Sequence, residues 1–241
     1  MEVPHLEAVL FDMDGVVINS AAVADRILIE SAAAHGAHLT DRELHRLNGA
    51  SGVQFWSYVK DTYELSQTVE ELYESYDAGA EVAAYSPKLI ASGLAALLVD
   101  LVGSGVRVGL VTSGRRWRAL KVLDLLGDPD RWAVTVCGED TAAHKPDPSP
   151  YRLAAESLAV HPSACLAIED SRRGIQSARA AGMVALAYRG FGVRSEAEAE
   201  AHGVVEVFGM EDLKSLRRRH AYLYRCRKRG RSVLAKPREE K

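Results

Sequence analysis

Short apolar segments alternate with amphipathic ones along most of this chain, and this alternation restricts its fold more than any other feature. The predicted strands are apolar or β-branched and are bounded by Gly, Pro or charge: 8–12, 106–112, 133–137, 165–170, 184–188 and 204–207. The helices predicted with them are 94–103, 116–126, 149–159, 174–181 and 211–218. Strands and helices in this order form a parallel sheet covered by helices. We therefore predict an α/β fold with a Rossmann-like parallel-sheet core.

One stretch interrupts this rhythm, between the first and second predicted strands. It has helical patterns over 22–34, 41–47, 53–62 and 69–80, with glycines as breakers and no convincing strand. We predict three parts, which are a Rossmann-like core over 1–19 and 88–216, an inserted α-helical domain over 20–87, and a basic C-terminal helix or tail over 217–241.

Charge is unevenly distributed between the tail and the rest of the chain. Residues 214–241 contain twelve Lys and Arg against two Glu, so with a net charge of −3 the preceding residues carry −13. The acidic body disfavours nucleic acid as a partner, whereas the tail interleaves cations with aromatic residues and could contact RNA or another anionic surface. A solvated helix is the alternative interpretation of the tail.

Cysteine usage and hydropathy bear on the compartment. Cys137, Cys165 and Cys226 are odd in number and lack zinc-type spacing, which disfavours both a disulfide framework and a zinc site. The N-terminal residues do not resemble a signal peptide, and no apolar run approaches the length of a membrane span. We predict a cytoplasmic protein with no membrane contact, whose oligomeric state the sequence leaves open.

The first predicted strand runs into two carboxylates spaced by one residue, Asp12 and Asp14, followed by Gly15. A polar turn would explain this motif alone. The functional interpretation makes Asp12 a covalent nucleophile, because carboxylates form aspartyl-phosphates. Asp14 would then protonate the leaving oxygen and later deprotonate water.

The second predicted strand ends in Thr112, Ser113 and Gly114, just before a helix that opens with Arg115 and Arg116. A hydroxyl group with backbone N–H groups at a helix start suits a phosphate dianion, although such a sequence is also a common helix cap. Either arginine could reach a substrate, or both could be solvated.

Two further motifs lie at or after predicted strand ends. Lys145 precedes a rigid Pro-Asp-Pro turn, so the prolines could aim its ammonium, although most lysines are simply solvated. Glu169 and Asp170 end another apolar strand, and with Asp12 they offer the oxygen ligands that Mg²⁺ prefers; a helix cap would explain the pair equally well. The carboxyl edge of a parallel sheet is where ligands bind, so these motifs together predict a phosphoryl-transfer site.

In this order, the motifs FDMDG, VTSG, KPDP and IEDS resemble those of the haloacid dehalogenase superfamily of phosphatases and phosphomutases over about residues 6–210. The resemblance implies that the inserted helices are a cap domain like that of the subfamily related to β-phosphoglucomutase and phosphoglycolate phosphatase. It also implies metal ligation by Asp12, by Asp14 through its backbone carbonyl, and by Asp170 and Glu169. Thr112 and Lys145 would hold the phosphate, with Ser113 and Gly114 in the same turn.

The resemblance favours a Mg²⁺-dependent phosphatase acting on a small phosphorylated metabolite. Dehalogenases of the family lack an acid at the position of Asp14. Mutases resemble one another in a cap-loop arginine and a helix histidine, and residues 48–52 and 21–25 contain neither. A mutase of the β-phosphoglucomutase type remains the alternative, and an inactive core with a partner-binding tail is the alternative from another class.

Neutral polar residues in the cap loop bear on the substrate. Asn48, Ser51 and Gln54 favour a sugar or polyol phosphate. Phe55 and Trp56 nearby either line the substrate site or form the core of the inserted domain.

Overall fold

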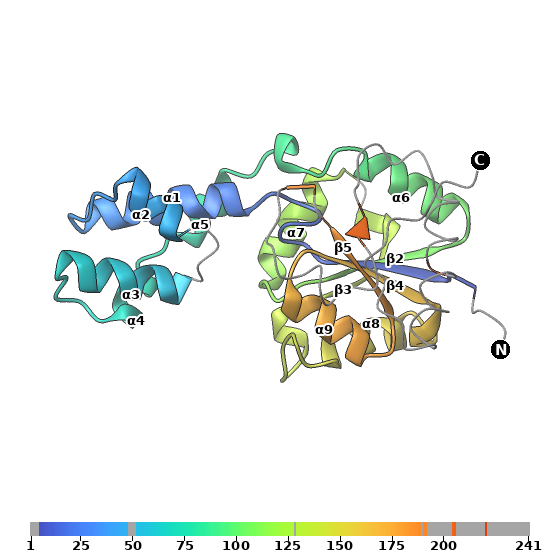
Figure 1. The fold of residues 1–241 in the computed structure, drawn as a ribbon. Coiled ribbons are helices and arrows are strands. Elements are labelled where there is room, and N and C mark those ends of the chain that lie inside the picture. Colours follow the sequence, from blue (N-terminus) through green and yellow to red (C-terminus); the bar gives the residue numbers. More distant parts are fainter. Residues whose placement is uncertain are drawn as a thin grey trace, which may run out of the picture. The chain divides into compact units, whose positions relative to one another are not determined.

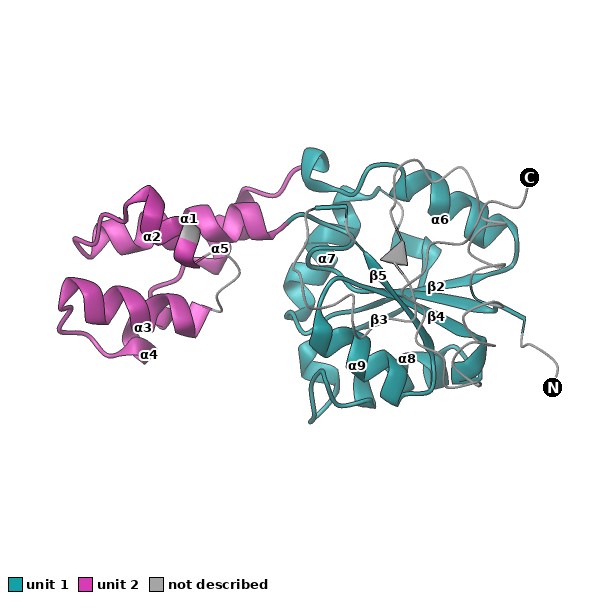
Figure 2. Ribbon diagram, in the orientation of Figure 1, with its two compact units in different colours: residues 1–19, 87–241 teal, residues 20–86 magenta. Residues whose placement is uncertain are grey.

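A computed structural model of the 241-residue chain describes residues 5–47, 52–127, 129–188, 190–191, 204–205 and 220. The chain divides into two compact units (Figure 2). Residues 1–19 and 87–241 form the core unit, and residues 20–86 form the inserted unit. Within the described residues, no helix combines the length and the apolar character that crossing a bilayer requires.

The core unit is built on one parallel sheet whose strand order is β3-β2-β1-β4-β5-β6 (Figure 1). The strands are β1 Ala8–Phe11, β2 Arg107–Val111, β3 Trp132–Val136, β4 Cys165–Glu169, β5 Val184–Tyr188 and β6 Val204–Val205. Every residue of β1, β4 and β5 is buried, as expected for strands with helices on both faces. The predicted α/β fold with a parallel sheet is confirmed.

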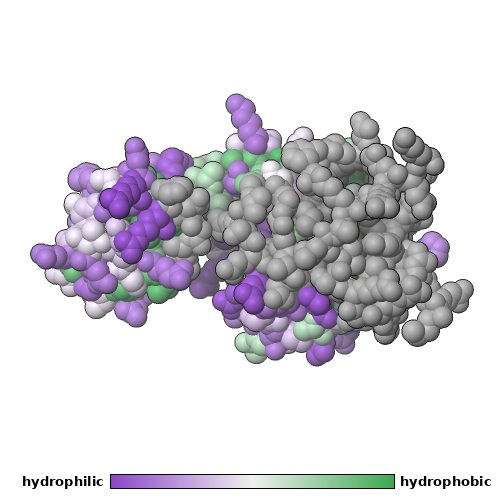
Figure 3. All heavy atoms as spheres, in the orientation of Figure 1, coloured by the Kyte–Doolittle hydropathy of each residue, from purple (hydrophilic) through white to green (hydrophobic). Residues whose placement is uncertain are grey.

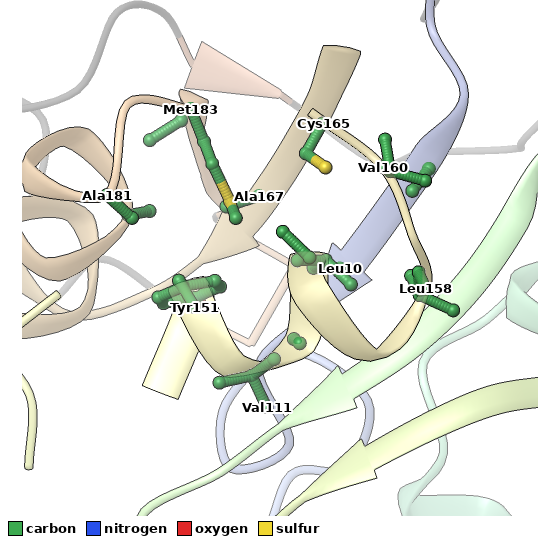
Figure 4. Close-up of a cluster of buried hydrophobic side chains, with 14 of the residues drawn as sticks. Leu10, Val111, Tyr151, Leu158, Val160, Cys165, Ala167, Ala181 and Met183 are labelled. Atoms are coloured by element: carbon green, nitrogen blue, oxygen red, sulfur yellow. The ribbon is translucent and has the colours of Figure 1, made fainter. Parts of the chain in front are cut away.

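Helices cover both faces of this sheet (Figure 1). They are α6 Leu94–Gly103, α7 Arg116–Leu125, α8 Ser149–Ser157 and α9 Arg172–Ala180, with short 3-10 turns η1 Pro87–Leu89, η2 Pro129–Arg131, η3 Gly138–Asp140 and η4 Pro162–Ala164. Helices α8 and α9 pack on one face, where side chains such as Tyr151, Leu10 and Ala167 form a buried cluster (Figure 4). From β1, the strands β2 and β3 are added on one side of the sheet, and β4, β5 and β6 are added on the other side. Right-handed connections in these two directions place the connecting helices on opposite faces of the sheet.

The predicted strand boundaries differ slightly from the observed ones, in a way that matters for the site. Asp12, Thr112 and Asp170 were predicted as the last residues of their strands, but each lies one residue beyond the strand end. Their side chains therefore belong to the loops at the carboxyl edge of the sheet.

The inserted unit is helical, with α1 Ala21–Ala34, α2 Asp41–Leu47, α3 Gly52–Tyr63, α4 Val69–Glu74 and α5 Ala78–Ala83. Its core contains the fully buried Trp56 and Val59 and the nearly buried Phe55, so the core interpretation of this aromatic segment is confirmed. Hydrophilic and intermediate side chains cover most of its surface on the face drawn in Figure 3.

The single helix predicted over 69–80 is wrong. Two helices replace it because polar side chains cap their ends at the break. Ser75 ends α4 and donates its hydroxyl to the Leu72 carbonyl at 2.6 Å. Asp77 starts α5 by accepting the Ala80 backbone N–H at 2.8 Å.

Several predictions lie outside the described residues. They include the helix over 211–218, Cys226, the cap-loop residues 48–51, and all of the tail over 217–241 except His220. The His220 ring is buried, and its Nε2 lies 3.0 Å from the Ser163 carbonyl oxygen.

Candidate active site

The strand order reverses at β1, whose neighbours β2 and β4 are reached by connections in opposite directions. Ligands of open parallel sheets bind at the carboxyl edge beside such a reversal. Phe11 pairs with Leu110 of β2 and Ile168 of β4, so the next residue, Asp12, lies between the ends of these two strands. The Asp12 backbone N–H donates to the Ile168 carbonyl at 2.9 Å, which extends the ladder to the predicted nucleophile.

The Asp12 carboxylate contacts a buried lysine. Lys145 Nζ donates to Asp12 Oδ1 at 2.6 Å, to Glu169 Oε1 at 2.6 Å and to the Val111 carbonyl at 2.8 Å. An ammonium has three N–H donors, and these acceptors match that number. Burial alone would lower the pKa of Lys145, but the Asp12 and Glu169 carboxylates reverse the effect and raise it. Lys145 is therefore a fixed cation rather than a solvated one.

The backbone of Lys145 is held as well as its side chain. The residue precedes a cis peptide bond to Pro146 and lies in the segment that leads to α8. The Arg173 guanidinium, from α9, donates through Nε and Nη2 to the Lys145 carbonyl at 3.0 and 2.7 Å. Arg173 of α9 thus holds the backbone of the lysine in place.

Glu169 is fully buried at the end of β4 and accepts three side-chain hydrogen bonds. Besides Lys145, the Tyr151 hydroxyl donates to Oε1 at 2.7 Å and the Ser171 hydroxyl donates to Oε2 at 3.1 Å. A buried carboxylate is tolerated when it is paired and hydrogen-bonded in this way. Gly174 of α9 makes the room, because a Cβ there would lie 1.9 Å from the carboxyl carbon of Glu169.

Three carboxylates gather at this edge of the sheet. Asp12, Glu169 and Asp170 each offer an oxygen, and these oxygens lie within 4.8 Å of one another. Burial, followed by the Glu169 charge, raises the pKa of Asp12 well above its usual range, although Lys145 opposes this effect. One lysine therefore does not compensate the negative charge gathered here, and a divalent cation with oxygen ligands fits this cluster.

Gly15 shapes the cluster from the turn after β1. Its φ is +80°, and a Cβ on it would lie 2.0 Å from Asp170 Oδ2. Glycine is therefore required at this position for two reasons: the backbone is left-handed, and Asp170 occupies the space that a side chain would need.

Thr112, Ser113 and Gly114 form a tight turn between β2 and α7. The Gly114 backbone N–H donates to the buried Thr112 Oγ1 at 2.9 Å, while Ser113 is exposed. At the next helix start, the Arg116 backbone N–H donates to the Glu139 carboxylate at 3.1 Å. Two of the backbone N–H groups that suggested an anion site are thus occupied by the chain's own oxygens.

Asp14 contacts an arginine that sequence reasoning did not single out. Arg118 Nη2 lies 3.1 Å from Asp14 Oδ1, and the two side chains are 18% and 36% exposed. The arginines considered from the sequence lie elsewhere, since Arg116 pairs with Asp140 at 2.5 Å and Arg115 is exposed. Helical spacing separates Arg118 from Arg116 by about half a turn, but it does not indicate which of the two faces Asp14.

The structure thus brings Asp12, Lys145, Glu169 and Asp170 into one cluster, with Thr112 at the neighbouring strand end. Tyr151, Arg173 and Gly174 complete this cluster without having been predicted. Gly174 was predicted to open the helix over 174–181, whereas α9 begins at Arg172 and places this glycine in its first turn.

Comparison with known proteins identifies the family. A model of the haloacid dehalogenase-like hydrolases matches residues 6–182. Validoxylamine A 7'-phosphate phosphatase of Streptomyces hygroscopicus subsp. limoneus is 31% identical over 217 residues, which are 88% of this chain and 96% of that protein. N-acetylmuramic acid 6-phosphate phosphatase of Pseudomonas aeruginosa is 30% identical over 190 residues, 77% of this chain and 82% of that protein.

A solved structure agrees with both matches. The crystal structure of CbbY from Rhodobacter sphaeroides in complex with phosphate has a TM-score of 0.67 and 25% identity, and covers 87% of this chain and 99% of that one. The chain belongs to the haloacid dehalogenase-like hydrolase family, which confirms the resemblance predicted from its motifs. The sequence also predicted a phosphoric monoester hydrolase, and both sequence relatives are named as phosphatases.

Proposed function

We propose that this chain is a Mg²⁺-dependent phosphatase that hydrolyses a small sugar or polyol phosphate through an aspartyl-phosphate on Asp12. The observation that carries the proposal is the position of the Asp12 carboxylate, which is held by Lys145 and stands with Glu169 and Asp170 at the reversal of strand order. The names of the sequence relatives support a phosphate ester of a polyhydroxylated compound.

Asp12, Glu169 and Asp170 would hold the cation, together with the backbone carbonyl of Asp14. When bound, Mg²⁺ supplies positive charge for the phosphate oxygens and offsets the crowding of carboxylates. The chain's own cation has a related role, because Lys145 keeps a positive charge beside Asp12 and lowers the repulsion between two anions as the substrate approaches.

The reaction proceeds in two displacements at phosphorus. An Asp12 carboxylate oxygen attacks the phosphorus atom, and the bond to the alcohol oxygen breaks as Asp14 gives that oxygen a proton. Asp14 then takes a proton from water, and the water oxygen attacks the phosphorus of the aspartyl-phosphate. Inorganic phosphate leaves and both aspartates return to their starting state. Thr112 would contact a phosphate oxygen, whereas Lys145, whose three N–H groups are taken by Asp12, Glu169 and Val111, would act on the phosphate through its charge.

The test is release of phosphate from p-nitrophenyl phosphate and from a panel of sugar and polyol phosphates, with and without Mg²⁺. We expect turnover that needs Mg²⁺ and is abolished in Asp12→Asn, which preserves the size of the side chain. Undiminished turnover by this variant would exclude the covalent role of Asp12. Isomerisation of a sugar phosphate that requires a bisphosphorylated sugar, without net phosphate release, would assign the site to a mutase instead.

A further inference from the structure

Arg118 lies beside the predicted catalytic turn, on the first turn of α7. Its Nη2 contacts Asp14 Oδ1 at 3.1 Å, and its side chain is only 18% exposed. A Cβ built on Gly114 would lie 3.3 Å from Arg118 Nη1 and 3.1 Å from Thr112 Oγ1. The guanidinium therefore contacts the carboxylate of the first motif and lies beside Gly114 in the turn of the second motif.

Other arginines at this helix start do not share that position. Arg116 is directed to Asp140, through contacts of 2.6 and 2.5 Å, and its side chain is 46% exposed against 18% for Arg118. The position of Arg118 is thus specific to one residue of the helix, and it is not a general consequence of a basic segment.

We propose that Arg118 is a positioning residue that holds the Asp14 carboxyl group where it can transfer a proton to the leaving oxygen. The inference rests on the proposed function, in which Asp14 is the general acid. An aspartate side chain rotates about two bonds, and a charge-assisted hydrogen bond to a mostly buried guanidinium restricts that rotation. The proton moves from Asp14 to the alcohol oxygen as the phosphorus–oxygen bond breaks, and Arg118 neither gains nor loses a proton.

This role predicts a dependence on the leaving group. The p-nitrophenolate ion is a stable anion and leaves without a proton, whereas an alkoxide from a polyol needs one. Loss of orientation at Asp14 therefore slows the first displacement of alkyl phosphates and has little effect on the first displacement of p-nitrophenyl phosphate. The ratio kcat/KM reports this first displacement, whereas the second displacement, in which Asp14 is the base, is common to both substrates. A structural role of Arg118 would slow both substrates alike, and a role in gripping the phosphate would raise KM for both.

The experiment compares kcat and KM of wild type, Arg118→Met and Arg118→Lys on p-nitrophenyl phosphate and on glycerol 2-phosphate at saturating Mg²⁺. Arg116→Met is the matched control, because it removes an arginine–aspartate pair from the same helical turn. For Arg118→Met we expect kcat/KM on glycerol 2-phosphate to fall about 10- to 100-fold, and kcat/KM on p-nitrophenyl phosphate to change less than about threefold. Arg118→Lys should recover part of the loss, and Arg116→Met should behave as wild type on both substrates.

Equal losses of kcat/KM on the two substrates would overturn the inference while leaving an active wild type and the proposed function intact. A wild type that hydrolyses neither substrate would overturn the proposed function and this inference with it. If circular dichroism finds Arg118→Met unfolded, Arg118→Lys and Arg118→Gln carry the same comparison, and unequal losses on the two substrates remain the supporting result.

Discussion

Substitution of Gly174 by alanine tests whether the Glu169 carboxylate is fixed as described. The new Cβ would lie 1.9 Å from the carboxyl carbon and Oε1, whereas ordinary contact begins at 3.4 Å. The buried carboxylate must therefore withdraw by about 1.5 Å, which disturbs its hydrogen bonds with Lys145, Tyr151 and Ser171.

The expected cost follows from these contacts. Overpacking a rigid interior costs about 1 to 3 kcal/mol, and each disturbed bond to a buried charge costs a similar amount. Replacing glycine by alanine in a helix stabilises the folded chain by about 0.5 to 1 kcal/mol, which offsets part of this cost. We expect a net loss of about 2 to 4 kcal/mol, which lowers Tm by about 5 to 15 °C for a chain of this size.

Thermal and urea denaturation followed by circular dichroism measure this loss. Gly103→Ala is the matched control, because Gly103 is also helical and a Cβ there meets nothing within 4 Å. That variant should be as stable as wild type or slightly more stable. If Gly174→Ala matched Gly103→Ala in both assays, the close approach of α9 to Glu169 would be refuted.

Three further predictions concern the same cluster and its surroundings. Tyr151→Phe removes a 2.7 Å hydrogen bond to the buried Glu169 and should cost about 1 to 3 kcal/mol in urea denaturation, and an unchanged midpoint would contradict that bond. Gly15→Ala should weaken Mg²⁺ binding more than tenfold in isothermal titration calorimetry, because the added Cβ displaces Asp170. Gly36→Ala is the control, since Gly36 also has a positive φ but a Cβ there meets nothing within 4 Å, and this variant should bind Mg²⁺ as wild type does. Burial raises the pKa of Cys137 to about 11, so its thiolate is scarce at pH 8. Iodoacetamide should therefore alkylate Cys137 far more slowly in the folded chain than in urea, as measured by peptide mass spectrometry. Equal rates of alkylation would contradict the burial of this thiol.

The sequence predicted the core elements well because burial on both faces leaves a strong apolar signal in each strand, as in β1, β4 and β5. It failed at residues 69–80, where helical propensity continues through a break that depends on the side chains of Ser75 and Asp77. Capping of this kind is a local competition between hydrogen bonds, and apolar periodicity does not record it.

The candidate site also contains residues that the sequence could predict and residues that it could not. Asp12, Thr112 and Glu169 could be placed together because parallel strands end at one edge. The partners of those residues could not, since Tyr151 and Arg173 reach the cluster from helices whose rotation depends on the packed core. Arg118 illustrates the limit most clearly, because a helix start with three arginines does not reveal which of them faces the sheet.

Trapping the aspartyl-phosphate is the sharpest test of the covalent role of Asp12. The enzyme is mixed with excess substrate and Mg²⁺, quenched in acid within one turnover, and digested for peptide mass spectrometry. We expect a phosphoryl group on Asp12, and none on this peptide in Asp12→Asn. A wild-type enzyme that releases phosphate through the same turnover while Asp12 stays unmodified, or carries the group on another residue, would contradict this role.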